Sequence, residues 1–385
     1  MNNIENLLMK MCPDGIQFKK IKEICSEVIV PMRDRPKVFD GEIPWCRIED
    51  IEGKFFNKSL SGLKVSQEVI KEMNLKVFPM GTVICSCSAS IGVYAINTQP
   101  LITNQTFIGL VCGKEICNKY LLYFMETQTK NLIRQATTGT IPYISRNKFE
   151  ELEVPVPPME IQQEIVRILD RFTELEAGLQ AELDVRKKQY EYYKEKLLTF
   201  DEKMSMVTLP AISVNHDRKR KPITGNQREQ GSIPYYGASG VVDYVKDYLF
   251  DGDYLLISED GANLTARVTP IAFSISGKTW VNNHAHILQF QTGIDRKFVE
   301  YYLNSIDLSY YTTGAAQPKL NQYNLNKIPI PNPSFEEKKK IVEILDVFSG
   351  MCNDLEIGLP AEIEARHKQY EYYRDKLLTF ERKVV

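Results

Sequence analysis

The stretch KQYEYYKEKLLTF spans residues 188–200, and KQYEYYRDKLLTF spans residues 368–380. Eleven of the thirteen positions are identical. The two differences exchange Lys194 for Arg and Glu195 for Asp, so they keep the charge. Because a charged, tyrosine-rich segment returns after 180 residues, the sequence predicts an internal duplication of the whole chain.

An apolar seam leads into each copy of this motif. Apolar residues recur at steps of three and four from Ile161 to Phe200, which is the spacing of a coiled coil. A helix of about 40 residues would be roughly 60 Å long, and we expect two such helices to pack antiparallel on each other. Gly178 and Pro360 predict a kink or break in each. The seam positions, interrupted by Arg186 and Arg366, are Ile161, Ile165, Ile168, Phe172, Leu175, Leu179, Leu183, Tyr190, Tyr193, Leu197 and Phe200, then Ile341, Leu345, Phe348, Cys352, Leu355, Leu359, Ile363, Tyr370, Tyr373, Leu377 and Phe380.

The segments outside the helices predict globular, strand-rich parts that also echo each other. TNQTFIGL (103–110) parallels VNNHAHIL (281–288), and TTGTIPYIS (137–145) parallels TTGAAQPKLN (312–321). Their β-branched and aromatic residues with turn punctuation are typical of strands. We therefore predict an α+β fold, with two mixed, strand-rich domains separated by two long antiparallel coiled-coil helices in a pseudo-twofold repeat. The predicted boundaries are 1–156 for the first domain, 157–203 for the first helix, 204–331 for the second domain and 332–385 for the second helix.

The helix entrance PNPSF (331–335) superficially resembles a motif of adenine methyltransferases. Prolines hold the chain extended there, and Ser334 with Glu337 predicts a capping box, which explains the same residues without catalysis. The sequence contains no glycine-rich loop for a methyl donor, no phosphate-binding loop of the GxxxxGK[ST] type and no nucleophile elbow. We therefore predict a chain without a catalytic site.

Composition points to a soluble protein that is nearly neutral. The formal net charge is −2 and the pI about 6.2, so charge alone does not indicate nucleic-acid binding. No apolar run reaches the length of a membrane span, and the first residues lack the pattern of a signal peptide. The eight cysteines are expected to be reduced thiols in a cytosolic protein.

Two histidines, His284 and His286, are one residue apart on a predicted strand and so face the same way. A metal site would need further ligands at matching spacing, and no acidic or cysteine partner stands at such a spacing. We expect strand residues near a core, with no metal and no cofactor bound by this chain.

The run HDRKRKPITGNQRE (216–229) is the densest positive segment, and it opens the second globular part. Such a run is often only a solvated loop, but positive charge within reach of phosphates suits DNA. Polar loops rich in Thr, Asn and Gln suit base edges, although each could equally be a capped turn. The candidate DNA-binding residues are Arg33, Arg35, Arg47, Lys54, Lys58, Thr138, Thr140, Arg218, Lys219, Arg220, Lys221, Arg228, Lys278, Thr313, Gln317 and Lys319.

Taken together, the two globular parts, the entrances VPVPP (154–158) and IPIPNP (328–333), and the repeated KQYEYY endings resemble one family over essentially the full length. The chain resembles the specificity (S) subunit of type I restriction–modification systems. IVRILD (165–170) with IVEILD (341–346), and WVNNHAHIL (280–288), are similar to that family as well.

The resemblance implies that each globular domain reads one half of a bipartite DNA site, while the helices set the spacer between the halves. It also implies a cytoplasmic complex with two methyltransferase (M) subunits and, for cleavage, two restriction (R) subunits. S-adenosylmethionine, ATP and Mg²⁺ would then bind to those partners. The repeated motif would supply two equivalent docking surfaces, made of Tyr190, Tyr192, Tyr193, Leu197, Phe200, Tyr370, Tyr372, Tyr373, Leu377 and Phe380.

Other interpretations of the same residues stay open. The motif residues could simply close the intramolecular seam, a reading that fits Tyr192 and Tyr372 least because they fall off it. The chain could be a stand-alone DNA-binding regulator, but that function would need more positive charge than the sequence has. A coiled-coil scaffold without nucleic acid would leave two large globular domains without a purpose.

Overall fold

The computed structural model describes residues 2–137, 140–314 and 318–383. The chain divides into two compact units. Unit 1 comprises Met1–Gly178 and Ile363–Val385, and unit 2 comprises Leu179–Glu362. Unit 1 is therefore assembled from two separate stretches of the chain, whereas unit 2 is continuous.

Unit 1 is centred on a five-stranded sheet of order β2-β9-β6-β7-β4, with a three-stranded sheet β5-β3-β8 and the pair β1-β10. Strand β9 reads FIGLVC and buries its first four residues, as expected for an apolar run in a central strand. The strands are β1 (Phe18–Lys20), β2 (Cys25–Ile29), β3 (Ile43–Cys46), β4 (Phe55–Phe56), β5 (Lys64–Val65), β6 (Val83–Ser86), β7 (Tyr94–Asn97), β8 (Ile102–Thr103), β9 (Phe107–Cys112) and β10 (Glu153–Pro155).

Unit 2 repeats this plan with a four-stranded sheet β12-β19-β16-β17, a second sheet β14-β13-β18-β15 and the pair β11-β20. Its strands are β11 (Met206–Thr208), β12 (Ser213–Asn215), β13 (Gln230–Gly237), β14 (Gly240–Val245), β15 (Phe250–Asp251), β16 (Tyr254–Ser258), β17 (Ala272–Ile275), β18 (Lys278–Val281), β19 (Ala285–Phe290) and β20 (Pro329–Pro331).

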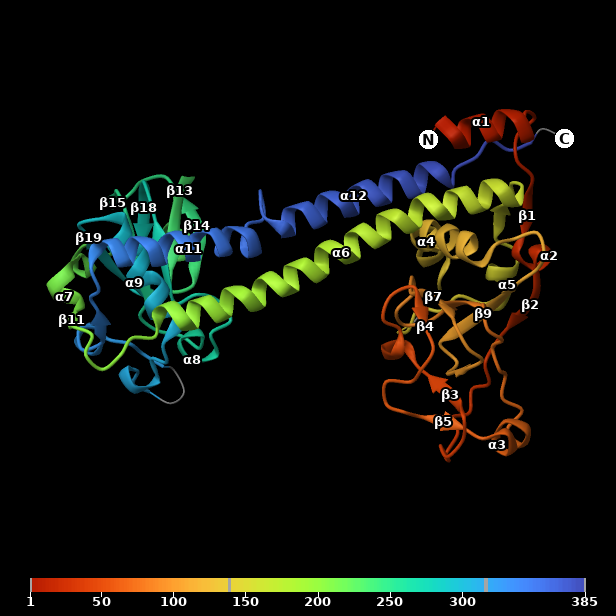
Figure 1. The fold of residues 1–385 in the computed structure, drawn as a ribbon, viewed down its shortest axis with the longest axis horizontal. Helices are drawn as coiled ribbons and strands as arrows, with labels where there is room; N and C mark the ends of the chain where they lie inside the picture. The colour runs from red at the N-terminus through yellow and green to blue at the C-terminus, as the bar shows by residue number, and fades with distance from the viewer. Residues whose placement is uncertain (1, 138–139, 315–317, 384–385) are drawn as a thin grey trace. The chain divides into compact units, whose positions relative to one another are not determined.

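Short helices connect the strands of both units. In unit 1 they are α1 (Asn2–Met11), α2 (Ile21–Ile24), α3 (Gln67–Glu72), α4 (Asn118–Gln135), α5 (Arg146–Glu150) and the 3₁₀ turn η1 (Ile48–Asp50). In unit 2 they are α7 (Leu209–Ile212), α8 (Asn263–Ala266), α9 (Gly293–Ser305), α10 (Gln322–Leu325) and the 3₁₀ turns η2 (Asp217–Lys219), η3 (Gly225–Gln227) and η4 (Ser309–Tyr311). Figure 1 places α4 beside the first part of α6 (Met159–Leu198), where Lys119 forms an ion pair with Asp170 at 2.7 Å.

The pairing register confirms the predicted duplication. Ile108 of β9 pairs with Cys85 of β6, and His286 of β19 pairs with Ile257 of β16. The strand orders β2-β9-β6-β7 and β12-β19-β16-β17 therefore correspond, with Ile108 and His286 at matched positions. The α+β fold with two mixed, strand-rich parts is confirmed.

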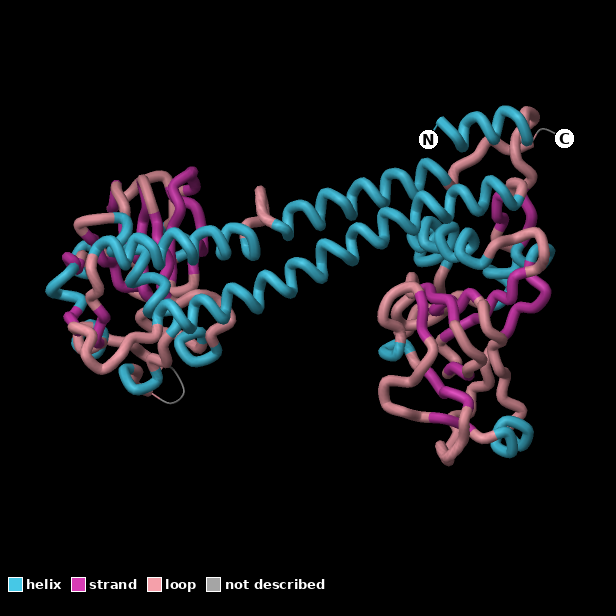
Figure 2. The backbone as a smooth tube through the Cα atoms, viewed as in Figure 1, coloured by secondary structure: helices cyan, strands magenta, loops and turns pink. Residues whose placement is uncertain are grey.

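The break predicted near Pro360 is present in the second long helix, whereas the first long helix has no break at Gly178. The first, α6, runs without interruption through Gly178. The second is divided into α11 (Phe335–Asn353) and α12 (Leu359–Leu377), and Figure 2 shows the short loop between them. The break was expected near Pro360 and lies just before it. Gly358 permits it, because an added Cβ would approach the carbonyl oxygens of Asp354 and Gly350 to 2.6 Å.

The helices run antiparallel within each unit. In unit 1, Phe172 stacks on Tyr373 and Glu176 approaches His367. Residue numbers therefore rise along one helix as they fall along the other. In unit 2, Tyr193 stacks on Phe348 at 5.2 Å, and Arg186 and Lys187, seven and six residues earlier, lie near Cys352. The predicted antiparallel seam is confirmed, and the capping box at Ser334 is present as well.

Two predicted seam positions are wrong. Leu355 lies in the break before α12 and is 76% exposed, and Leu175 of α6 is 45% exposed. Both follow the three-and-four spacing, but the first stands where the helix is interrupted and the second is not covered by a partner. The rest of the seam includes fully buried residues such as Ile161, Ile165 and Leu345.

The last residues of the chain complete the core of unit 1. Leu377 and Leu378 are buried beside the N-terminal helix α1, which Figure 1 draws over the end of α12. Beyond them the backbone amide of Ile16 donates to Glu381 at 2.9 Å, and Lys383 donates back to Ile16 at 2.9 Å. The C-terminal stretch is thus bonded to Ile16, just before β1.

Candidate nucleic-acid and subunit interfaces

The basic segment of unit 2, residues 216–221, forms the turn η2 against strand β19. The amide of His216 donates to the carbonyl of Ile287 at 2.9 Å, which fixes the segment to the sheet edge. Arg218, Lys219 and Lys221 are exposed. The segment therefore presents three positive side chains to solvent, as a phosphate-contacting surface requires.

Arg220, predicted together with these three, points the other way. Its side chain is only 13% exposed, and its Nη1 donates to Glu259 at 2.6 Å and to the carbonyl of Ala285 at 2.7 Å. Its charge is already matched by a buried carboxylate, so its contact is with the protein interior.

The segment 313–319 lies against the same place. Thr313 and Lys319 exchange two backbone hydrogen bonds of 2.8 Å, so the two ends of the segment are held side by side. Both residues are exposed, and Lys319 also approaches Glu259, with Nζ 3.3 Å from Oε1. Glu259 thus joins the loop to Arg220 and to the basic segment. Gln317 lies outside the described residues.

The remaining candidates of unit 2 lie around the second sheet. Lys278 is exposed on β18, with its ammonium 4.8 Å from the ring centre of Tyr248. Arg228 is half-buried, stacked over Tyr235 and paired with Asp243 at 3.0 Å. The ion pair and the stacking hold the Arg228 guanidinium in place.

Unit 1 brings together fewer of its candidates at the matched edge. Thr137 donates its backbone amide to Tyr143 at 3.0 Å, the counterpart of the Thr313–Lys319 bond, and Thr140 is exposed in this loop. Burial raises the pKa of Tyr143, and the nearby charge of exposed Arg33 opposes that rise. Arg33 therefore lies near Tyr143, the residue that bonds to Thr137. Thr138 lies outside the described residues.

Three further DNA-binding candidates of unit 1 have no contact with the loop near Tyr143 among the interactions of the described residues. Arg35 is exposed, with its guanidinium 5.2 Å from the ring centre of Trp45. Arg47 is half-buried and pairs with Glu49 at 2.8 Å. Lys58 is exposed after β4.

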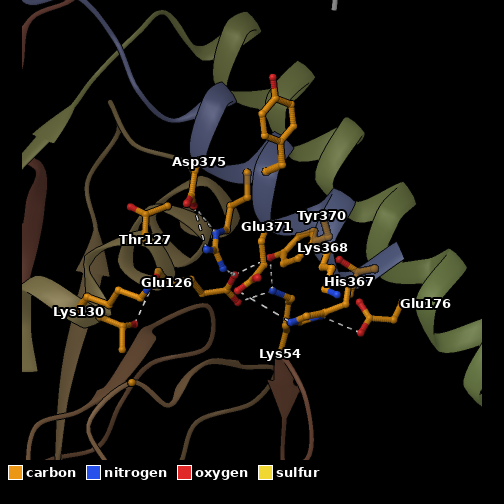
Figure 3. Close-up of a pocket in the computed structure, with 15 residues that line it drawn as sticks. Lys54, Glu126, Thr127, Lys130, Glu176, His367, Lys368, Tyr370, Glu371 and Asp375 are labelled. Atoms are coloured by element: carbon orange, nitrogen blue, oxygen red, sulfur yellow. Dashed lines mark hydrogen bonds and ion pairs between the residues drawn. The ribbon is translucent and has the colours of Figure 1, made fainter. Parts of the chain in front are cut away.

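Lys54 is committed to the protein interior. It forms an ion pair with Glu126, and its Nζ lies 2.9 Å from the hydroxyl of Tyr370 (Figure 3). The rings of Tyr123 and Tyr370 lie 4.5 and 5.1 Å from the ammonium. Burial lowers the pKa of Lys54, against the opposing effect of Glu126. This residue joins the sheet of unit 1 to helix α12.

Around Lys54 lies a groove of about 730 Å³ between α4, the end of the unit 1 part of α6, and α12 (Figure 3). Tyr370 of the repeated motif forms its floor, with its hydroxyl 2.5 Å from Glu126. Glu371, Tyr372 and Arg374 of the same motif line it. The motif is thus placed at the junction between a helix and a globular part.

Unit 2 has a groove of about 610 Å³ at the matched junction. Tyr190, Glu191 and Lys194, the first copies of Tyr370, Glu371 and Arg374, line it. Burial raises the pKa of Tyr190 to about 12.

Both grooves are supported by the same second contact between a globular part and a long helix. In unit 1 the hydroxyl of Tyr123 donates to Asp170 at 2.7 Å, and in unit 2 that of Tyr301 donates to Asp346 at 2.5 Å. The duplication therefore includes both the repeated motif and the contact between each globular part and its other long helix, α6 in unit 1 and α11 in unit 2.

Most of the predicted subunit-interface residues pack inside their own unit. Tyr192 and Tyr372 differ, because they are 56% and 61% exposed. The residues that pack into the unit cores or stack across the seam are Tyr190, Tyr193, Leu197, Phe200, Tyr370, Tyr373, Leu377 and Phe380. For these eight the seam interpretation accounts for the structure, and the two exposed tyrosines stay candidates for a partner surface.

Sequence reasoning missed two groups of residues. Leu198 and Leu378, one place beyond the predicted seam, are 5% and 4% exposed, and the double leucine of the motif was the available signal. It also missed that Asp217 and Glu259 surround His286, for which no local spacing gives a sign.

Within the ranges described by the structure, no group of three or more His, Cys, Asp or Glu residues is placed to hold a metal ion. His284 pairs with Asp260 at 2.9 Å, and His286 pairs with Asp217. Among the same residues, no helix is both long and apolar enough to cross a membrane.

Comparison with known proteins identifies a family. The profile of the type I restriction modification DNA specificity domain matches residues 13–185 and 207–365. The type I restriction enzyme EcoprrI specificity subunit of Escherichia coli is 30% identical over 339 residues, which is 82% of either chain. The EcoR124I/EcoR124II specificity subunit of Escherichia coli is 34% identical over 288 residues, covering 68% of this chain and 70% of that one.

Solved structures give the same fold. The S subunit of a type I restriction–modification system from M. genitalium aligns with a TM-score of 0.59 at 17% identity, over 94% of this chain and 96% of that one. A chain from a structure on complex assembly and conformational transition of the type I R-M system aligns with a TM-score of 0.59 at 14% identity. It covers 94% of this chain and 97% of that one.

Proposed function

This chain belongs to the type I restriction modification DNA specificity family and acts as a DNA sequence-specificity subunit, and we propose that each of its units reads one half of a bipartite DNA site. One observation carries the proposal. Both units repeat one fold, and in each a positive residue lies near a polar segment. In unit 1, Arg33 lies near Tyr143, which bonds to Thr137. In unit 2, the turn of Arg218 is joined through Arg220 and Glu259 to Lys319, which bonds to Thr313.

The chemistry of these segments suits DNA. Exposed Arg218, Lys219 and Lys221 would contact phosphates, which position a protein on the duplex without reading sequence. The polar loops around Thr140 and Thr313 would supply hydrogen bonds to base edges. The long helices would set the number of unread base pairs between the two halves.

Two methyltransferase subunits would dock on the repeated motif, one at each groove. Exposed Tyr192 and Tyr372 lie in the shared stretch KQYEYY and adjoin Tyr193 and Tyr373 in the same edge-on geometry, with ring centres 5.3 and 5.2 Å apart. Large aromatic side chains of this kind are frequent energetic centres of protein interfaces. Identical surfaces would bind identical partners.

The catalysis would belong to the partners. S-adenosylmethionine would bind to the methyltransferase subunits, which would flip out and methylate one adenine in each half. ATP and Mg²⁺ would serve restriction subunits when these join, and the assembly would work in the cytoplasm. This chain would select the site and hold the complex together.

Co-expression of this chain with the adenine methyltransferase subunits of its own genome tests the proposal. Sequencing of methylated bases in the host DNA should reveal a new bipartite motif with adenines on opposite strands. A stable complex without a new motif would contradict the reading function and leave the assembly function standing.

The double variant Tyr192→Ala with Tyr372→Ala tests the docking surface. Each truncation should weaken docking by about 2 kcal/mol, since central interface tyrosines contribute that much, and calorimetric titration of the partner would measure it. Thr199→Ala with Thr379→Ala is the matched control, because these exposed hydroxyls bond to their own helices. Equal affinities for the two double variants would exclude the tyrosines as the docking surface.

A further inference from the structure

His286 is a buried histidine whose two ring nitrogens both face acceptors. It is 1% exposed. Its Nδ1 lies 2.5 Å from Oδ2 of Asp217, and its Nε2 lies 2.7 Å from the carbonyl oxygen of Leu320. A carboxylate and a carbonyl oxygen only accept, so both bonds require a proton on the ring nitrogen. The geometry is that of an imidazolium with two donors.

The charges around His286 are balanced by residues from several segments. Asp217 and Glu259 are negative, and Arg220 and Lys319 are positive. Burial alone would raise the pKa of Asp217, but the hydrogen bond and charge of His286, the amide of Ile287 and the charge of Arg220 together lower it. A buried imidazolium is tolerated here because its partners are negative and hydrogen-bonded.

This cluster fastens both candidate DNA-contacting segments of unit 2. Asp217 is in the turn that carries Arg218 and Lys219, and it also accepts from the amide of Ile287 at 2.9 Å. Leu320 directly follows the 313–319 loop, and its amide donates to the carbonyl of Glu259 at 2.7 Å. His286, on strand β19, bridges the two segments with one hydrogen bond to each.

We propose that His286 is a positioning residue for DNA reading: by bonding Asp217 and Leu320 at once, it sets where segment 216–221 and the paired residues Thr313 and Lys319 meet the half-site that unit 2 reads. It does not touch DNA itself, because it is buried. The inference deepens the proposed function and depends on it. In unit 2, His286 would join the turn proposed to contact phosphates to the residues proposed to contact bases.

The test compares His286→Ile with the double variant Asp217→Val and His286→Ile. Ile and Val are the residues that unit 1 has at the matched places, Ile108 and Val30. Each variant is co-expressed as the full chain with its methyltransferase subunits, and methylation is sequenced. The unvaried half of the motif is the internal control.

In His286→Ile, the preference for the correct bases in the half-site that unit 2 reads should fall about tenfold. A change of this size corresponds to the loss of one buried hydrogen bond to a charged group. The other half-site should not change. In the double variant the melting temperature should recover, since an apolar pair fills the site without a stranded carboxylate, while discrimination stays low. Recovery of both together would overturn the proposal and reduce His286 to core packing, as would unchanged discrimination in His286→Ile.

Hydrogen exchange on the full-length chain separates this inference from the proposed function. The amides of Lys319 and Leu320 should exchange about tenfold faster in His286→Ile, whether or not the chain reads DNA. Absence of any methylated motif with the wild-type chain would refute the proposed function. Unchanged exchange of the two amides would refute the positioning role.

Discussion

At the matched position on the central strand, unit 1 has Ile108 and unit 2 has His286. Ile108 belongs to the same buried apolar cluster as Cys87 and Ile144, so this part of unit 1 is apolar. Around His286 lie Asp217 and Glu259, so the matched part of unit 2 is ionic. The backbone is the same in both, because Ile144 donates to the carbonyl of Cys87 at 2.8 Å just as Leu320 donates to that of Glu259 at 2.7 Å.

At the opposite end of each unit, beside the long helix, the two copies of the repeated tyrosine differ in the opposite sense. In unit 1, Tyr370 bonds to the ion pair of Lys54 and Glu126. In unit 2 its repeat, Tyr190, has a hydroxyl partner in Ser349. Unit 1 thus joins its sheet to the helix motif through a charged network. Unit 2 has a charged network at the edge proposed to meet DNA and a separate ion pair, Lys338 with Asp295 at 2.9 Å, where α11 meets α9.

The difference teaches that the duplication preserves the apolar pattern and the helix motif, while each unit places its buried charges independently. Packing specifies the common backbone. Buried polar groups fix individual segments, since leaving any of them unpaired is costly. Two units of one fold can therefore hold different loops rigid.

The largest expected effect comes from importing the histidine into unit 1. Ile108→His should lower the free energy of unfolding of unit 1 by about 3 kcal/mol, because the apolar junction offers the imidazole no partner. Adding Val30→Asp should restore about 1 kcal/mol by supplying one. Urea unfolding can be followed on unit 1 alone by the fluorescence of buried Trp45, after Trp280→Phe removes the other tryptophan.

Ile108→Val is the control for this comparison, with an expected loss of about 1 kcal/mol for one methyl group. If Ile108→Val and Ile108→His lowered the free energy of unfolding equally, the site around Ile108 would accept an imidazole, and the contrast with the site around His286 would be wrong.

A smaller effect should separate the two copies of the helix tyrosine. Tyr370→Phe removes a hydroxyl bonded to Lys54 and Glu126, and it should cost unit 1 about 1 kcal/mol. Tyr190→Phe should cost unit 2 less, because its hydroxyl contacts no ion pair. Trp45 and Trp280, each kept in turn as the sole tryptophan, report the two unfolding curves. A larger loss in Tyr190→Phe would reverse the assignment of the charged junction to unit 1.

The smallest effect should appear in the acid range. The pKa of Asp217 is lower in the folded chain than its ordinary value, so its contribution to stability is present above that ordinary value and is lost as the pH falls through the folded one. Asp217→Asn should flatten the decline of unit 2 stability below about pH 4. Urea unfolding of both proteins from pH 6 downward, followed on Trp280, measures this. If the two curves of unfolding free energy against pH ran parallel, the pKa of Asp217 would not be lowered by His286 in the folded chain.

The periodic pattern predicted much of the fold, because burial along a helix repeats with the helix turn. Ile161, Ile165 and Leu345 are fully buried as expected. Leu355 has the same spacing, yet it is exposed since the helix stops at Asn353 and resumes at Leu359. A pattern of side chains does not show where the backbone leaves the helix when the break is only a few residues long.

The candidate site was less accessible from sequence. Arg220 and Lys54 were chosen for their charge, as were Arg218 and Lys58, but the first two face carboxylates that lie 39 and 72 residues away along the chain. Which positive side chain is neutralised inside the protein depends on these distant pairings. The same holds for His286, whose partners come from three separate segments.

The discontinuity of unit 1 has a consequence during synthesis. Unit 2 is continuous from Leu179 to Glu362, so the ribosome delivers all of it before the second stretch of unit 1 begins at Ile363. At typical elongation rates, making unit 2 occupies on the order of 10 to 40 s. Throughout that time the first stretch of unit 1 lacks Tyr370, Leu377 and the C-terminal segment that bonds to Ile16.

The unit that starts first is therefore the one that closes last. A chain truncated before Ile363 would contain all of unit 2 and an incomplete unit 1, whose uncovered apolar seam would be a target for a chaperone.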